Sequence, residues 1–248
     1  FGRATRLIGS ELVRRGIKVS AIVPRRANQK KVENLSGITV LGFDIKNPAE
    51  MLRIFKGCRS DIYHTQEPSL GTFLAQKHHP DRKHIITFRD TRVLSDWMIE
   101  LRLPSLNTFQ VLFNWWYEDS CFVRKAVRQA DRRVVAAHLL AERAQKKYRL
   151  PALPVFLPTP VEIPDRIVKD EHPTVCYIGR WDRRKRLELL FDLISRNPAV
   201  EFIIAGSSRD GNYDSYLRNE FRKFHNVRLP GFINQFETDQ LSELLSRS

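Results

Sequence analysis

The stretch VCYIGRWDRRKRLELLFDLI, residues 175–194, carries the clearest structural signal in this chain. A short apolar run stops at Gly179, five basic residues follow within seven positions, and leucines then return at helical spacing. This pattern is typical of a buried strand that turns into an amphipathic helix in a parallel α/β sheet. We expect a strand at 174–178, a turn at Gly179 and a helix over 184–195.

The same alternation of short apolar strands and amphipathic helices runs through the rest of the chain. Before the stretch, the sequence predicts helices over 3–16, 47–56, 70–78, 121–130 and 139–148, and strands over 17–24, 37–45, 61–68, 84–90 and 131–137. After it, strands are expected at 200–206 and 226–232, and helices at 215–224 and 237–248. Asn47 before Pro48 is a good helix N-cap.

A proline-rich segment separates the two sets of elements. Residues 155–173 hold four prolines and show no helical period, which is the character of an interdomain linker. We therefore predict an α/β protein of two Rossmann-like domains with a cleft between them. Residues 1–157 form the N-terminal domain, 158–172 the linker and 173–248 the C-terminal domain.

The charge is unusual for a chain of 248 residues. The formal net charge is +14, and most of it falls in two windows. Residues 1–31 carry nine Arg or Lys against one acid, and residues 121–150 carry nine against two. Such patches attract an anionic membrane surface, an acidic substrate or nucleic acid, or are merely solvated helix faces. No RNA-binding signature or zinc-finger spacing accompanies them, which disfavours nucleic acid.

The cysteines, histidines and aromatic residues indicate the cellular compartment of the protein and the nature of the predicted cleft. Three scattered cysteines indicate reduced thiols in the cytoplasm, and no apolar run approaches the roughly 18 residues of a membrane span. The histidines show no metal-ligand spacing, so no metal is predicted. Residues 91–120 are rich in aromatic side chains. We expect these side chains to be packed in the core, with the wall of an acceptor cleft as the alternative.

Ligands of open α/β sheets bind beyond the carboxyl ends of the strands. There, Arg180 and Lys185 bracket the predicted helix start, a place that favours phosphate. Arg grips phosphate oxygens through a planar fork and Lys supplies a point charge. The neighbouring Arg183, Arg184 and Arg186 are expected to be only solvated. An exposed basic helix start with no ligand is the plainer interpretation of the same residues.

Two further turns strengthen the phosphate interpretation. The strands at 200–206 and 226–232 end in AGSS and PGF, and both turns would open on the same edge. The three segments VCYIGRWDRRKRLELLFDLI, VEFIIAGSS and NVRLPGF together resemble the donor-binding domain of family-4 retaining glycosyltransferases. In the N-terminal part, DIYHTQEP, IITFRD, ADRRVVAAHLLAERAQKKYRLP and LPTPVEIP are similar to segments of the same family, in the right order.

The resemblance implies a GT-B architecture and roles for particular residues. Arg180 and Lys185 would hold the donor diphosphate and stabilise the leaving group, which is the catalytic role. The donor-binding set would be Gly179, Arg180, Lys185, Gly206, Gly231 and Phe232, and no metal or cofactor is required. On the acceptor side, His64, Gln66, Glu67 and Arg89 would stand at strand ends that face the cleft.

The sequence departs from the family pattern at several places. The family's Lys-Gly pair is Lys185-Arg186 here, which is acceptable if Arg186 lies inside the helix. Arg89 replaces a histidine expected beside the donor sugar. It would bind an anionic sugar or acceptor, or form a structural ion pair. The first strand of the family and its C-terminal Glu segment would fall outside residues 1–248, so the chain is expected to be truncated at both ends.

These observations predict a hexosyltransferase that uses a nucleotide-sugar donor and retains the anomeric configuration. The acceptor would be a glycan, a lipid-linked molecule or a small molecule. The reduced cysteines predict a cytoplasmic protein. The basic windows 1–31 and 121–150 suggest, as a hypothesis, peripheral contact with the inner face of a membrane. The alternatives are a nucleotide-sugar epimerase of the same architecture and a non-catalytic nucleotide-sugar-binding or interaction protein that retains the fold.

Overall fold

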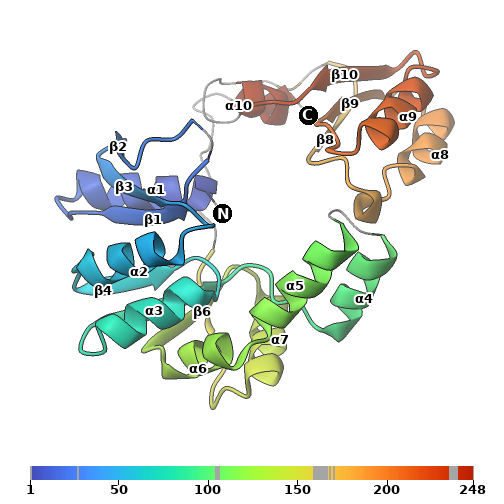
Figure 1. Cartoon of the computed structure of the whole chain (residues 1–248). Helices are drawn as coiled ribbons and strands as arrows, with labels where there is room; N and C mark the ends of the chain where they lie inside the picture. The colour runs from blue at the N-terminus through green and yellow to red at the C-terminus, as the bar shows by residue number, and fades with distance from the viewer. Residues whose placement is uncertain are drawn as a thin grey trace. The chain divides into compact units, whose positions relative to one another are not determined.

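The computed structural model describes residues 2–26, 28–103, 107–158, 167, 169, 171–234 and 240–247 (Figure 1). The chain divides into two compact units. The first comprises Phe1–Trp97 and Leu112–Pro160, and the second comprises Met98–Val111 and Val161–Ser248. Most of the predicted linker, 158–172, lies outside the described residues. No helix in the described ranges is long and apolar enough to cross a bilayer.

The first unit begins with α1 (Gly2–Arg14) and a three-stranded sheet. Its strands are β1 (Ser20–Pro24), β2 (Val32–Leu35) and β3 (Ile38–Phe43), in the order β1-β3-β2. β1 and β3 are parallel, as expected, but β2 is an antiparallel strand that the sequence pattern did not predict. Ser36 and Gly37 both have positive φ, 52° and 80°, and make the tight turn of this hairpin.

A four-stranded parallel sheet completes the first unit. It has the order β4 (Ile62–Thr65), β5 (Lys83–Phe88), β6 (Arg132–Val135), β7 (Val155–Phe156). The helices of this part are α2 (Pro48–Gly57), α3 (Leu70–His78), α6 (Cys121–Gln129) and α7 (His138–Tyr148). Asn47 caps α2 by accepting from the Glu50 N–H, as predicted. Ile86 and Phe88 of β5 are fully buried, which confirms a parallel α/β sheet in this region.

The aromatic-rich segment 91–120 forms α4 (Leu94–Arg102) and α5 (Thr108–Glu118). Trp97 is fully buried, as core packing requires. Phe109 and Trp116, however, are 80% and 69% exposed. The prediction of buried packing is therefore right for Trp97 and wrong for these two residues. Helical spacing brings only part of such a segment onto its buried side.

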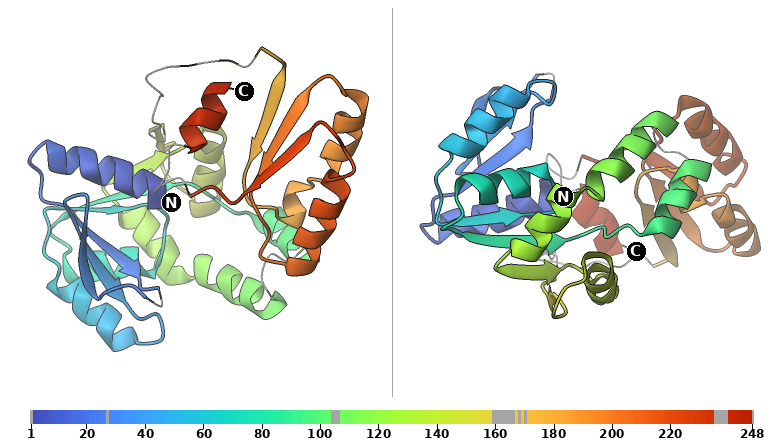
Figure 2. Two further views of the ribbon diagram at one scale, coloured as in Figure 1. Left: turned by 90° about the horizontal axis from the view of Figure 1, so that it is seen from above. Right: turned by 60° about the horizontal axis from the view of Figure 1, so that its bottom comes forward.

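The second unit contains a three-stranded parallel sheet of order β10-β9-β8. Its strands are β8 (Thr174–Ile178), β9 (Glu201–Ala205) and β10 (Val227–Gly231). Helices α8 (Leu189–Arg196) and α9 (Gly211–Phe221) cover one face (Figure 2, left), and α10 (Gln240–Arg247) follows. The core under these helices includes Trp181, Ile194, Phe202, Leu217 and Phe221.

The connection from β8 to α8 differs from the prediction. The expected helix over 184–195 starts only at Leu189, and Arg183–Lys185 form a single 3-10 turn, η1. Arg186 follows in the left-handed region at φ 51°. The expectation that Arg186 lies inside the helix is wrong. A position with positive φ favours glycine because glycine has no Cβ, and this accounts for the glycine of the family pattern.

Gly206, just after β9, sits where no side chain fits. Its φ is 140°, and a Cβ atom there would lie 1.9 Å from the carbonyl oxygen of Gly179. The same Cβ would lie 3.0 Å from two atoms of the Trp181 ring. The turn after β9 therefore packs directly on the turn after β8, and the fully buried Trp181 packs against both.

Substituting Gly206 with alanine tests this contact. The added methyl must push two backbone segments apart, so Gly206→Ala should lower the free energy of unfolding by about 2–4 kcal/mol. Urea unfolding followed by circular dichroism measures the change. Gly211→Ala is the control, because nothing lies within 4 Å of a Cβ at this first residue of α9. Equal stability of the Gly206 variant and the parent would show that the turns are not packed in this way.

A second substitution tests the conformation of Arg186. Arg186→Gly removes the Cβ strain of the left-handed backbone but gives the unfolded chain more freedom. We expect the free energy of unfolding to stay constant or rise by up to about 1 kcal/mol. Arg186→Ala keeps the Cβ and should show no such gain. A clear loss of stability in the glycine variant alone would place residue 186 in ordinary helical geometry.

Candidate functional site

The ends of the three strands in the second unit are joined by backbone hydrogen bonds. The Gly179 N–H donates to the Ala205 oxygen at 3.1 Å, and the Gly206 N–H donates to the Gly231 oxygen at 2.8 Å. The Trp181 N–H also donates to the Ser207 oxygen at 3.0 Å. The three turns that the sequence singled out thus lie at one carboxyl edge of one sheet, the usual ligand edge of such folds.

Two of the five basic side chains in the β8–α8 connection have acidic partners. Arg183 pairs with Asp210 at 3.1 Å, and its guanidinium lies 4.5 Å from the ring centre of Tyr213. Arg184 pairs with Asp182 at 2.9 Å and also with Glu100 of α4. The expectation that these arginines are merely solvated is therefore wrong.

Asp182 organises the loop. Its side chain accepts hydrogen bonds from both the backbone N–H and the guanidinium of Arg184. The hydrogen bond from the Arg184 side chain lowers the pKa of Asp182. Asp182 is also the N-cap of η1, so this turn already has a carboxylate at its amino end. A phosphate near the loop would therefore depend on side chains rather than on a helix N-terminus.

Arg180 and Lys185 differ from Arg183 and Arg184 in having no acidic partner in an ion pair among the residues that the structure describes. Both are exposed, and neither takes part in an ion pair within the described ranges. Among the glycines of this edge, a Cβ at Gly231 would meet nothing within 4 Å, and Phe232 beyond it is exposed. Their roles toward a nucleotide stay predictions. For Gly206, the packing of the two turns supplies a structural reason for glycine that needs no ligand.

The four residues predicted for the acceptor side lie together in the first unit, at the carboxyl ends of β4 and β5. His64 Nε2 lies 2.7 Å from the Thr87 hydroxyl oxygen. Arg89 donates from Nε and from a terminal nitrogen to the side-chain oxygen of Gln66, at 3.0 and 2.7 Å. The Gln66 amide nitrogen is 3.3 Å from His64 Nε2. Desolvation and the charge of Arg89 lower the pKa of His64.

The side chain of Glu67 is hydrogen-bonded to the backbone of the segment that follows β5. Its Oε2 accepts from the backbone N–H groups of Arg89 and Asp90, at 2.8 and 3.0 Å. Burial raises the pKa of Glu67 to about 7, although these two hydrogen bonds oppose the rise. The carboxyl group therefore exchanges a proton near neutral pH. Nothing in the residue spacing indicated this, because burial of one side chain is decided by the whole fold.

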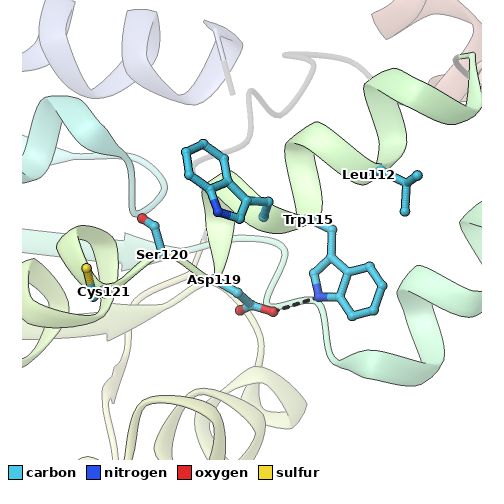
Figure 3. A pocket seen from close by; sticks show the side chains of 6 residues that line it. Leu112, Trp115, Asp119, Ser120 and Cys121 are labelled. Carbon is cyan, nitrogen blue, oxygen red and sulfur yellow. Dashed lines mark hydrogen bonds between the residues drawn. The ribbon is translucent and has the colours of Figure 1, made fainter.

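A hollow of about 460 Å³ lies where α5 meets α6 in the first unit (Figure 3). Sequence reasoning did not find it. Trp115 donates from its indole nitrogen to Asp119 at 3.0 Å and so fixes one wall. The residues that line the hollow are Leu112, Trp115, Trp116, Asp119, Ser120 and Cys121. No cluster of three or more metal-ligating side chains occurs in the part of the chain that the structure describes.

Solved structures share this fold at low sequence identity. The catalytic domain of starch synthase IV from Arabidopsis thaliana, bound to ADP and acarbose, matches with a TM-score of 0.60 and 12% identity, over 97% of this chain and 72% of that one. HepE of Anabaena, in complex with UDP and glucose, matches with a TM-score of 0.62 and 14% identity, over 99% and 68%.

The glycosyltransferase AviGT4, involved in avilamycin A biosynthesis, gives a TM-score of 0.53 and 16% identity, over 96% of this chain and 57% of that one. The two structures described above extend across the second unit as well as the first, so the α/β fold with parallel sheets is that of GT-B glycosyltransferases. A search of curated proteins found no match.

A family model described as Glycosyltransferase Family 4 matches residues 2–163. This range includes β1 to β7 and the residues His64, Gln66, Glu67 and Arg89, and it ends before the strand-end turns of the second unit. The match covers more than half of the sequence and agrees with the resemblance carried by its motifs. The chain therefore belongs to glycosyltransferase family 4.

Proposed function

We propose that the chain transfers a hexosyl unit from a nucleotide-diphosphate sugar to an acceptor hydroxyl, with retention of anomeric configuration. One observation carries the donor side of this proposal. Arg180 and Lys185 are exposed at the carboxyl edge of the second unit, whereas Arg183 and Arg184 beside them are held by acids. Arg186 is exposed as well. Arg180 and Lys185, the two cations singled out by the resemblance, are thus available to a ligand on a loop that Arg183 and Arg184 hold in shape.

The proposed chemistry is electrostatic. As the bond between the sugar and the phosphate breaks, negative charge grows on the diphosphate. The planar fork of Arg180 and the ammonium of Lys185 would stabilise that charge, so that no metal is needed for it. The relatives bound to ADP and to UDP with glucose support a nucleotide donor for this chain as well.

In this proposal, residues 173–248 bind the donor and residues 1–157 present the acceptor across a cleft. His64, Gln66, Glu67 and Arg89 would form the acceptor side. Gln66 orients Arg89 through two hydrogen bonds, which would direct its guanidinium at an anionic group of the sugar or of the acceptor. The acceptor itself is a glycan, a lipid-linked molecule or a small molecule.

Arg89 also favours a second candidate, a protein that binds nucleotide sugar without transferring it. The family pattern has a histidine at this place, so the replacement alters the surroundings of the reacting sugar. Incubation of the chain with a nucleotide sugar separates the two candidates. Release of free nucleoside diphosphate, with the sugar passed to water or to an added acceptor, supports the transferase. Binding without any turnover supports the second candidate.

Alanine variants test the proposed diphosphate clamp. Each charge-assisted contact to phosphate contributes about 1.5–3 kcal/mol, so Arg180→Ala and Lys185→Ala should each weaken nucleotide binding about 10- to 100-fold. Isothermal titration with UDP, ADP and GDP, in the presence of a chelator, measures the affinities. The nucleotide that binds most tightly also identifies the base of the donor.

The matched control is Arg222→Ala, which removes one exposed cation at the far end of α9 in the same unit. Its affinity for the nucleotide should equal that of the parent. Parent-like binding by both loop variants would remove the diphosphate clamp from the proposal. Equal losses in all three variants would mean that net charge alone attracts the nucleotide.

A further inference from the structure

Three helices of the first unit form one continuous layer. Helix α3 packs against α2 on one side and α6 on the other (Figure 1). The rings of Phe73 on α3 and Phe122 on α6 are 5.1 Å apart. Neighbouring helices pack about 8–10 Å apart, so three of them offer a broad surface more than 20 Å across.

The exposed charges of this layer all have one sign. The structure describes every residue of α2, α3 and α6, and their exposed ionised side chains are basic. They are Arg53, Lys56, Lys77, Lys125 and Arg128. The one acid in these helices is Glu50, which is only 6% exposed and accepts from the Asp44 N–H. We refer to these five cations and their helices as the basic layer.

The cations of the basic layer are not neutralised locally. In the described ranges, no ion pair involves Arg53, Lys56, Lys77 or Lys125. Elsewhere on the surface such pairs are common: Arg14 and Arg15 share Glu11, and Lys83 pairs with Asp131. The absence of exposed acids from three adjacent helices therefore distinguishes this layer from an ordinary solvated face.

Large apolar side chains are exposed among these charges. Leu52 on α2 is 43% exposed and lies one helical turn from Lys56. Phe122 on α6 is 51% exposed and lies three residues before Lys125. Helical neighbours at this spacing share a face. Cations beside exposed Leu and Phe are the composition of helices that lie at the surface of an anionic bilayer.

We propose that the basic layer docks on an anionic phospholipid bilayer, with Leu52 and Phe122 entering the headgroup region. The breadth of the layer fits a plane, and its charge is opposite to that of the lipid. This inference does not depend on the proposed transferase activity, because Arg180 and Lys185 belong to the other unit.

Co-sedimentation with vesicles tests the docking. The chain should bind vesicles of phosphatidylglycerol and phosphatidylcholine at low salt, and should bind pure phosphatidylcholine far more weakly. Each cation near an anionic surface contributes about 1 kcal/mol, a factor of about five. The quadruple variant Arg53→Gln, Lys56→Gln, Lys77→Gln, Lys125→Gln should therefore lose at least about a hundredfold in partitioning.

A control variant that loses the same number of positive charges outside the basic layer distinguishes docking through this layer from a general effect of net charge. Lys18→Gln, Lys146→Gln, Arg209→Gln and Arg222→Gln together remove four exposed cations that lie outside the basic layer. This variant should keep most of its binding. Equal losses in the two quadruple variants would overturn the proposal, because net charge alone would then explain the binding.

The variant Phe122→Ala distinguishes insertion of this side chain into the bilayer from electrostatic attraction of the layer to anionic lipid. It should weaken vesicle binding about fivefold or more even at high salt, whereas Phe109→Ala, an exposed aromatic outside the layer, should have little effect. Thermal unfolding checks that each variant is folded, and nucleotide titration checks that the donor side is intact. Tighter binding of a single-stranded RNA than of anionic vesicles, lost in the basic-layer variant, would overturn the proposal in favour of nucleic acid.

Discussion

The close approach of two backbone segments organises the second unit. The carbonyl oxygen of Gly179 occupies the space where any side chain at residue 206 would begin. This contact holds the turn after β8 against the turn after β9, and the hydrogen bond from Gly206 to Gly231 adds the turn after β10. Trp181 is buried beside the contact, with the guanidinium of Arg218 at 4.7 Å from its ring centre. The three strand ends are thus packed and hydrogen-bonded to one another, and the loop 180–186 leaves from this edge.

On that edge, five neighbouring cations have different surroundings. Arg183 and Arg184 find carboxylates on other elements, namely Asp210 at the start of α9 and Glu100 on α4. Asp182 within the loop adds a third. Such pairs hold the main chain in place rather than attract a ligand. Arg180, Lys185 and Arg186 remain exposed and take part in no ion pair within the described residues. The basic run thus becomes two structural and three available cations.

In the basic layer, residues that are distant in the sequence come together on one surface. The sequence windows 1–31 and 121–150 pointed to charge, but Arg53, Lys56 and Lys77 lie in neither window. Parallel strands with crossover helices bring α2, α3 and α6 side by side although their residues span 48–129. A surface of one sign therefore arises from three short segments, none of which is unusual alone.

Local sequence patterns were enough to predict the alternation of strands and helices, the Asn47 cap, the parallel strand pairs and the edge where Gly179, Gly206 and Gly231 meet. These features follow from local periodicity and from the geometry of parallel sheets. The structure was needed to reveal the β2 hairpin, the late start of α8, the left-handed Arg186, the ion pairs of Arg183 and Arg184, and the raised pKa of Glu67. The hairpin, the turn η1 and Arg186 depend on local backbone conformations that the hydrophobic period does not encode. Arg183 and Arg184 meet Asp210 and Glu100 from distant parts of the chain, and Glu67 is buried by the whole fold. Burial and such long-range charge pairing are properties of the assembled fold rather than of spacing.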